Sequence, residues 1–189
     1  RVLGDPISLK WLAELMRANY QPETGLITIG GIDNLEIDRQ SLRESIKVID
    51  RVTLLPMTIS AYLDLFVSLD SAHSKQQALT ALGLDEDIAR LHKGLGAKLS
   101  RSGWPLTQPQ AIRLKLASAL LAKPRLLVLG DIVDSVEIGV MEEVISLLKQ
   151  QGTTLLYFTK RQDLDTFSHT LEIEPESQRL TDISAEANS

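Results

Sequence analysis

The sequence predicts an α/β domain with a mainly parallel β-sheet that is flanked by helices. Segments with the period of a strand alternate along the chain with segments that have the period of a helix. Two of the expected strands are apolar without interruption, at residues 126–129 and 155–158. Such strands are typical of a parallel sheet that is buried on both faces.

The elements of the first half follow from periodicity and from turn residues. A strand is expected at residues 1–3, and the apolar positions of residues 8–18 predict a helix. A turn at Pro22 and Gly25 precedes a strand at residues 26–29. The next expected elements are a short helix, a strand, a helix and two short amphipathic helices, at residues 38–44, 46–49, 58–67, 74–82 and 85–91.

The second half begins with a loop at residues 94–109 that is rich in glycine, serine and proline. A strong helix at residues 110–122 ends before Pro124, and a buried strand at residues 125–129 follows. The remaining expected elements are a helix, a second buried strand, an edge strand and a polar tail that frays, at residues 141–150, 153–158, 168–174 and 180–189.

Composition excludes several classes of function. The chain has 189 residues, of which 43% are hydrophobic, and this is enough for one domain with its own core. A net charge of −5 argues against nucleic acid as a partner. There is no cysteine, and His73, His92 and His169 lack metal-ligand spacing, so no metal-ligating residue is predicted. No apolar run reaches the roughly 18 residues that a membrane helix needs.

Several segments, in order, resemble the nucleotide-binding domain of ABC exporters, in particular those of the peptide and type I secretion kind. The similar segments include residues 20–33, residues 91–95 and the stretch from 103 to 121. The resemblance implies a P-loop NTPase-like fold over residues 1–189, with a helical subdomain at about 58–122. The chain has no initiator methionine, so we expect a fragment that lacks the N-terminal strands of such a domain.

The resemblance places the phosphate loop at residues 4–11, where Gly4, Ser8 and Lys10 are the candidate nucleotide-binding residues. A functional loop has the pattern G-x-x-x-x-G-K-[ST], which holds phosphates and Mg²⁺. Here Leu9 replaces the second glycine and Trp11 replaces the hydroxyl that would bind Mg²⁺. Asp5 adds a negative charge and Pro6 removes an N–H donor. These replacements argue against binding of ATP and Mg²⁺ in the usual way, and an ordinary loop before a helix is the alternative.

The signature loop that contacts the partner's nucleotide would correspond to Leu106, Thr107, Gln108, Pro109 and Gln110. Leu106, Thr107 and Gln110 remain candidate nucleotide contacts. Pro109 cannot donate a backbone hydrogen bond and Gln108 would hinder close approach of the backbone to phosphate. We expect that this segment starts a helix and has lost the phosphate contact.

The catalytic positions implied by the resemblance are also changed. Gly130 stands where a metal-binding aspartate is expected, and Asp131 stands at the position of the catalytic carboxylate. Lys160 occupies the position of the switch histidine, and Arg51 is the nearest equivalent of the glutamine near the metal site. Asp131 and Lys160 are therefore the candidate catalytic residues. For Asp131, an ordinary loop position after a strand is an equal alternative.

Three functions remain open on the sequence. The favoured one is a domain of an ABC export transporter, at the cytoplasmic face of the membrane, that is impaired in ATP hydrolysis. It would act as a structural or regulatory partner of a transmembrane domain and of another ATPase domain, identical or different. The alternatives are an active ATPase that uses Lys10 and Asp131, and reuse of the fold to bind a different small molecule.

Overall fold

The computed structural model describes residues 1–4, 6–67, 72–164, 166–174 and 177–182. Asp5, for which a negative charge beside the phosphate loop was predicted, therefore lies outside the described residues. Most of the predicted polar tail does so as well. The elements in chain order are β1 (Val2–Leu3), α1 (Pro6–Met16), β2 (Thr28–Ile29), β3 (Ile32–Asp33), α2 (Arg39–Ser45), β4 (Ile46–Ile49), α3 (Ile59–Asp64), α4 (Ala72–Ala81), α5 (Asp85–Ala89), η1 (Gly94–Gly96), α6 (Gln108–Ala122), β5 (Leu126–Leu129), η2 (Asp131–Ser135), α7 (Ile138–Gln150), β6 (Thr154–Tyr157), β7 (His169–Glu174) and β8 (Ser177–Asp182).

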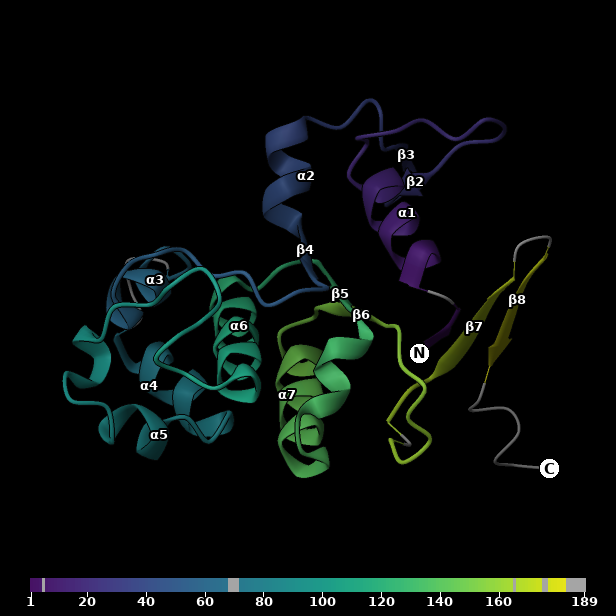
Figure 1. Ribbon diagram of the computed structural model, residues 1–189. Helices are drawn as coiled ribbons and strands as arrows, with labels where there is room; N and C mark the ends of the chain where they lie inside the picture. The colour runs from purple at the N-terminus through teal and green to yellow at the C-terminus, as the bar shows by residue number, and fades with distance from the viewer. Residues whose placement is uncertain (5, 68–71, 165, 175–176, 183–189) are drawn as a thin grey trace.

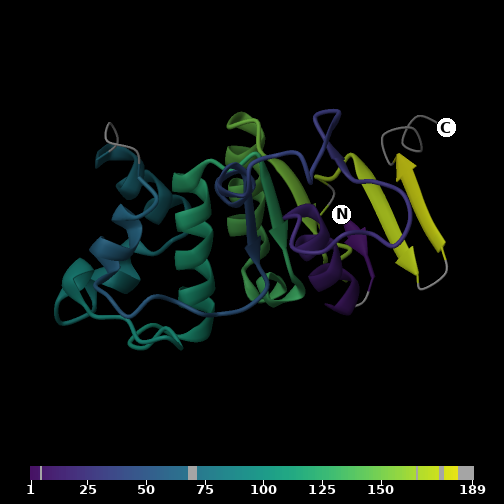
Figure 2. The ribbon, with the colours of Figure 1, turned by 90° about the horizontal axis from the view of Figure 1, so that it is seen from above.

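Parallel strands β4, β5 and β6 form the centre of the molecule, which confirms the predicted α/β fold class (Figure 1). Val48 pairs with Val128, and Val128 pairs with Leu156. On the far side of β6, Val2 forms a parallel bridge with Phe158, while β1 also pairs in parallel with β7. The two-residue strand β1 therefore connects the central sheet to the β7–β8 hairpin (Figure 2).

Alternate residues of β5 face opposite layers, as the period of a strand requires. Val128 packs with Leu9 of α1 on one face of the sheet. Leu127 and Leu129 belong to the larger core on the other face, which includes the buried residues of α6 and α7. Helix α1 thus covers one face while α6 and α7 cover the other (Figure 1).

Helices α3, α4 and α5 gather beside α6, away from the β7–β8 hairpin (Figures 1 and 2). Leu63 of α3, Leu79 of α4 and Ile88 of α5 are buried in the same core as the apolar residues of α6. Thr58 caps α3 by accepting a hydrogen bond from the N–H of Ala61 at 3.2 Å. This helical layer thus shares one continuous core with the central sheet.

Some predicted elements were wrong in their details. The strand expected at residues 168–174 is β7, which pairs on both sides, and is therefore not an edge strand. The polar tail does not fray from residue 180, because the antiparallel strand β8 continues to Asp182. The strand expected at residues 26–29 is reduced to β2, which forms a hairpin with β3 through Gly30 and Gly31, both at positive φ.

Candidate functional site

A cavity of about 550 Å³ lies at the carboxyl ends of the central parallel strands. Such edges are where open α/β sheets commonly bind ligands. The strand ends supply its central residues, and β1, the loop after it and α1 supply its other wall. The lining residues are Leu3, Gly4, Leu9, Lys10, Asp50, Arg51, Gly130, Asp131, Phe158, Thr159 and Lys160.

Four of the candidate residues predicted from the sequence meet in this cavity. Gly4 and Lys10 line it from the start of α1, Asp131 lines it from the end of β5, and Lys160 from the loop after β6. Lys10, Asp131 and Lys160 have exposed side chains. The fold therefore brings together charged groups that are up to 150 positions apart in the sequence.

The other four candidates do not line this cavity. Ser8 is half-buried in the first turns of α1. Leu106, Thr107 and Gln110 lie at the start of α6, where Leu106 is buried and belongs to the main core. A nucleotide contact by these three would need a site that lies outside the cavity.

The inner wall of the cavity is apolar. Leu9 is 5% exposed and forms a buried cluster with Val2, Val128 and Phe158. A leucine at this position thus packs as a core residue between α1 and the sheet, rather than leaving backbone free to approach a ligand.

Gly130 has little room for a side chain. A β-carbon built at this residue would lie 3.3 Å from Asp50 Cα, 3.3 Å from Leu9 Cδ1 and 3.4 Å from the carbonyl oxygen of Ile49. Two of these three atoms are backbone and cannot move without displacing β4. A side chain at the position where the resemblance implies a metal-binding aspartate would therefore require small shifts of Leu9 and of the backbone at the end of β4.

The charged rim contains an ion pair between adjacent residues. Arg51 donates to both carboxylate oxygens of Asp50 at 3.0 Å. Burial raises the pKa of Asp50, but the hydrogen bonds and charge of Arg51 outweigh it, and the pKa is below its ordinary value. Lys115 of α6 donates to the carbonyl oxygen of Arg51 at 2.6 Å. Burial lowers the pKa of the Lys115 ammonium.

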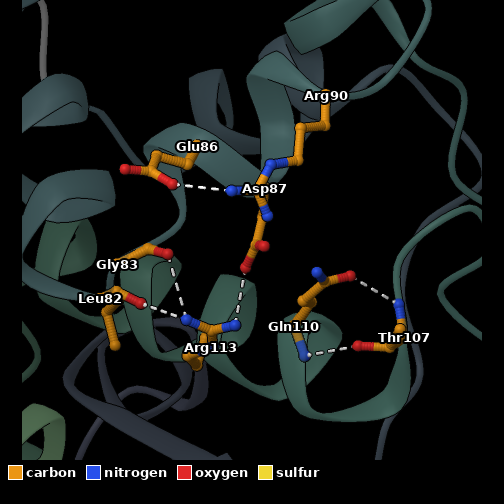
Figure 3. A network of polar contacts seen from close by, with 8 residues as sticks. All are labelled: Leu82, Gly83, Glu86, Asp87, Arg90, Thr107, Gln110 and Arg113. Atoms are coloured by element: carbon orange, nitrogen blue, oxygen red, sulfur yellow. Dashed lines mark hydrogen bonds and ion pairs between the residues drawn. The ribbon is translucent and has the colours of Figure 1, made fainter.

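Thr107 and Gln110 bond to each other in a reciprocal capping box at the start of α6 (Figure 3). The N–H of Thr107 donates to Gln110 Oε1 at 2.8 Å, and the N–H of Gln110 donates to Thr107 Oγ1 at 3.4 Å. Pro109 occupies the first turn, where its missing N–H is tolerated, as predicted. Thr107 and Gln110 therefore have a helix-capping role that requires no ligand.

One turn further along α6, Arg113 ties the helix to the α4–α5 turn (Figure 3). Its guanidinium donates to the carbonyl oxygens of Leu82 and Gly83 at 3.0 and 3.1 Å. It also forms an ion pair with Asp87 at 2.7 Å. These contacts fix the α4–α5 turn against the start of α6.

Sequence reasoning missed a polar cluster around Asp134, next to the cavity. The carboxylate oxygen Oδ1 of Asp134 accepts hydrogen bonds from the Tyr157 hydroxyl at 2.6 Å and from the Thr159 hydroxyl at 2.7 Å. Arg161 donates to the carbonyl oxygens of Asp134 and Val136, at 3.3 and 2.7 Å. The one available signal was a polar residue within the apolar stretch that follows β5.

This cluster joins η2 to the end of β6. Burial and the hydrogen bond to Asp134 raise the pKa of Tyr157 strongly, because an ionised tyrosine would be buried next to a carboxylate. Thr159 also accepts from the N–H of Arg161 at 3.0 Å. The loop that carries Lys160 is therefore anchored on both sides of that residue.

Within the described ranges, no three histidine, cysteine, aspartate or glutamate side chains gather closely enough to hold a metal ion. In the same part of the chain, no helix has the length and apolar character needed to cross a bilayer.

The fold and the cavity at its strand ends define an α/β domain of the P-loop NTPase-like class. A bacterial Atm1-family ABC exporter, solved with ATP bound, has a similar structure, with a TM-score of 0.77 and 20% sequence identity. The superposition covers 94% of this chain and 32% of that chain. This likeness shows the fold.

Sequence relatives are ATP-binding proteins of ABC exporters, which confirms the resemblance seen in the sequence. A lactococcin transport/processing ATP-binding protein LcnC-like from Lactococcus lactis is 27% identical over 161 residues, or 84% of this chain. A multidrug efflux ATP-binding/permease protein from Mycobacterium bovis is 30% identical over 188 residues, or 96% of this chain. The chain spans only 22% and 16% of these relatives, respectively. No family model matches the chain.

Proposed function

We propose that the chain is the nucleotide-binding-domain-like part of an ABC export transporter and that it is impaired in ATP hydrolysis. In this role it would keep the fold of an ATPase domain as a structural or regulatory partner. It would pair with another ATPase domain and dock on a transmembrane domain at the cytoplasmic face of the membrane.

The packing of Leu9 against Gly130 is the observation that carries the proposal. Leu9 is buried at the position where the resemblance implies a phosphate-loop glycine. Its Cδ1 atom lies 3.3 Å from where a β-carbon of residue 130 would be, at the position where the resemblance implies a metal-binding aspartate. Phosphoryl transfer relies on the positioning of charge around Mg²⁺. Leucine and glycine at these two positions offer no metal ligand.

The capping box at α6 supports the same proposal. The side-chain oxygens of Thr107 and Gln110 already accept backbone hydrogen bonds within their own helix start. They therefore stabilise the fold without a nucleotide. This pattern is expected where selection has kept the domain's shape and not its chemistry.

ATP turnover by the purified chain tests the proposal, with Lys10→Ala as the matched control. We expect no Mg-ATP hydrolysis above that of Lys10→Ala. Mg-ATP titration by calorimetry should likewise show no Mg²⁺-dependent heat at millimolar nucleotide. Turnover that is abolished by Lys10→Ala would overturn the proposal.

The alternative, an active ATPase that powers export, is favoured by one observation. Lys10, Asp131 and Lys160 line a single cavity, so a cation and a carboxylate could act on one ligand. In that case Asp131→Asn should abolish turnover while ATP binding persists. Unchanged turnover in Asp131→Asn would eliminate this mechanism.

A further inference from the structure

A second, smaller cavity of about 240 Å³ adjoins the first, between α1, the end of β4 and α6. Three residues, Lys10, Asp50 and Arg51, line both cavities. The second cavity extends away from Gly130, Asp131 and Lys160. Its complete lining is Lys10, Ala13, Glu14, Arg17, Val48, Asp50, Arg51, Thr53 and Lys115.

The lining is built by one face of a helix and by two distant elements. Lys10, Ala13, Glu14 and Arg17 are spaced by three and four positions, so they lie on one side of α1. Residues at and after the end of β4 form the second wall. Lys115 enters from α6, and its ammonium is held by the carbonyl oxygen of Arg51.

Positive charge exceeds negative charge in this cavity. Four lining residues are cationic and two are acidic, in a chain whose net charge is −5. The lining ion pair joins Arg51 to Asp50 at 3.0 Å. Within the described part of the chain, neither Lys10 nor Lys115 forms an ion pair, and the same holds for Arg17.

Arg17 lines the cavity, and one of its donors has no acceptor. Its Nε atom is buried and has no hydrogen-bond partner among the described residues. One terminal nitrogen of Arg17 makes a long hydrogen bond of 3.4 Å to the carbonyl oxygen of Ile46. A buried guanidinium N–H without an acceptor is unfavourable. Because Nε is out of reach of solvent, an oxyanion in the cavity would meet the terminal nitrogens of the guanidinium.

Lys115 is a second partly buried cation of the lining, and its ammonium donates to the carbonyl oxygen of Arg51. Burial lowers the pKa of its ammonium, the charge of nearby Arg51 lowers it as well, and the attraction of Asp50 opposes this shift. A partly buried cation without a counter-ion gains from an anion at hydrogen-bond distance. Arg17 and Lys115 face this one cavity from different helices.

We propose that this cavity binds a phosphate-type oxyanion through Arg17, Lys115 and Lys10. Arginine and lysine side chains from α1 and α6 would surround the oxygens. The ligand would be inorganic phosphate or the phosphate group of a larger molecule. This inference does not rest on the proposed function, because a hydrolysing domain could carry the same site.

Calorimetric titration of the purified chain with inorganic phosphate, at constant ionic strength, tests the proposal. We expect saturable binding that is about tenfold weaker in Lys115→Met and in Arg17→Gln. The control Lys93→Gln removes an exposed lysine outside the cavity and should bind as the original chain does. Circular dichroism and urea unfolding of each variant establish that it is folded.

Arg17→Lys keeps the positive charge and removes the terminal nitrogens of the guanidinium, so it tests the arginine without removing its charge. We expect weaker phosphate binding in this variant also. Absence of saturable heat with phosphate would overturn the proposal, and so would equal loss of binding in Lys93→Gln.

A competition experiment with Mg²⁺-free ATP distinguishes the sources of the phosphate group. Displacement of phosphate by ATP, lost in Lys115→Met, would identify the phosphates of a nucleotide as occupants of the cavity. Phosphate that binds and is not displaced would identify the free ion as the ligand. Both results support an oxyanion site, and neither depends on ATP turnover.

Discussion

Leu9 of α1 faces Gly130 at the end of β5: Leu9 Cδ1 lies 3.3 Å from the position that a β-carbon of Gly130 would take. Each residue differs from the one that the resemblance implies at its position, and the two differences are complementary in size. The larger residue on the helix fills the space that the smaller residue on the strand leaves open. The two positions should therefore respond to substitution as a pair.

Gly130→Asp should destabilise the domain by about 1–3 kcal/mol, because the new side chain would overlap Leu9 and the backbone of β4. Urea unfolding followed by circular dichroism measures this change. Gly139→Asp is the matched control, since no atom lies within 4 Å of a β-carbon at Gly139. The double variant Leu9→Gly with Gly130→Asp tests the pairing. Equal effects at Gly130 and Gly139 would contradict the steric argument.

Leu9→Ala should lower the free energy of unfolding by about 2–4 kcal/mol, since it opens a cavity within a buried cluster. Ile7→Ala, in the same helix, removes a side chain that is 65% exposed. That control should change stability by only about 0.5 kcal/mol. Equal losses in the two variants would show that Leu9 is not the core residue described here.

Thr107→Ala should cost about 1 kcal/mol of stability because it removes the cap of α6. Thr80→Ala, at an exposed position inside α4, is the control and should not lose stability. A double-mutant cycle with Gln110→Ala measures the coupling of the capping box. If the two substitutions were additive, the reciprocal hydrogen bonds would not contribute as a unit.

The raised pKa of Tyr157 predicts that the domain loses stability at high pH. Its pKa is raised in the folded state, so the folded chain holds the phenolic proton at pH values where the unfolded chain releases it. The resulting stability is fully present below about pH 10, the ordinary tyrosine pKa, and is lost as pH rises above that value. Urea unfolding between pH 8 and about 11 measures the slope.

Tyr157→Phe should reduce this slope and should also weaken the domain by about 1.5–3 kcal/mol, because Asp134 loses a hydrogen bond. Tyr62, whose pKa burial also raises, contributes to the slope and remains in the variant. An identical slope in Tyr157→Phe would mean that other groups cause the pH dependence.

The sequence was informative where one physical signal dominates. The uninterrupted apolar run Leu126–Leu129 predicted a central parallel strand, and the structure places it between β4 and β6. Because parallel strands end on one edge, residues after such strands converge, and Asp131 and Lys160 do line one cavity.

Features that depend on distant packing could not be predicted. Nothing local shows that Arg17 and Lys115, 98 positions apart, share a cavity. The capping role of Gln110 was hidden by its resemblance to a signature residue. Strand β8 was missed because its side chains are largely polar. Its backbone pairing with β7, and not an apolar pattern of its own, stabilises it as a strand.

The short strand β1 has a mechanical consequence. The described backbone pairing between the central sheet and the β7–β8 hairpin passes through Val2, which meets Phe158 on one side and Leu171 on the other. Gly4 and α1 follow β1, so a displacement of α1 would be transmitted to the central sheet and to the β7–β8 hairpin through the two residues of β1. Because so few residues make this pairing, the hairpin can separate from the central sheet by local unfolding. Amide protons of the hairpin should then exchange with solvent before those of β5.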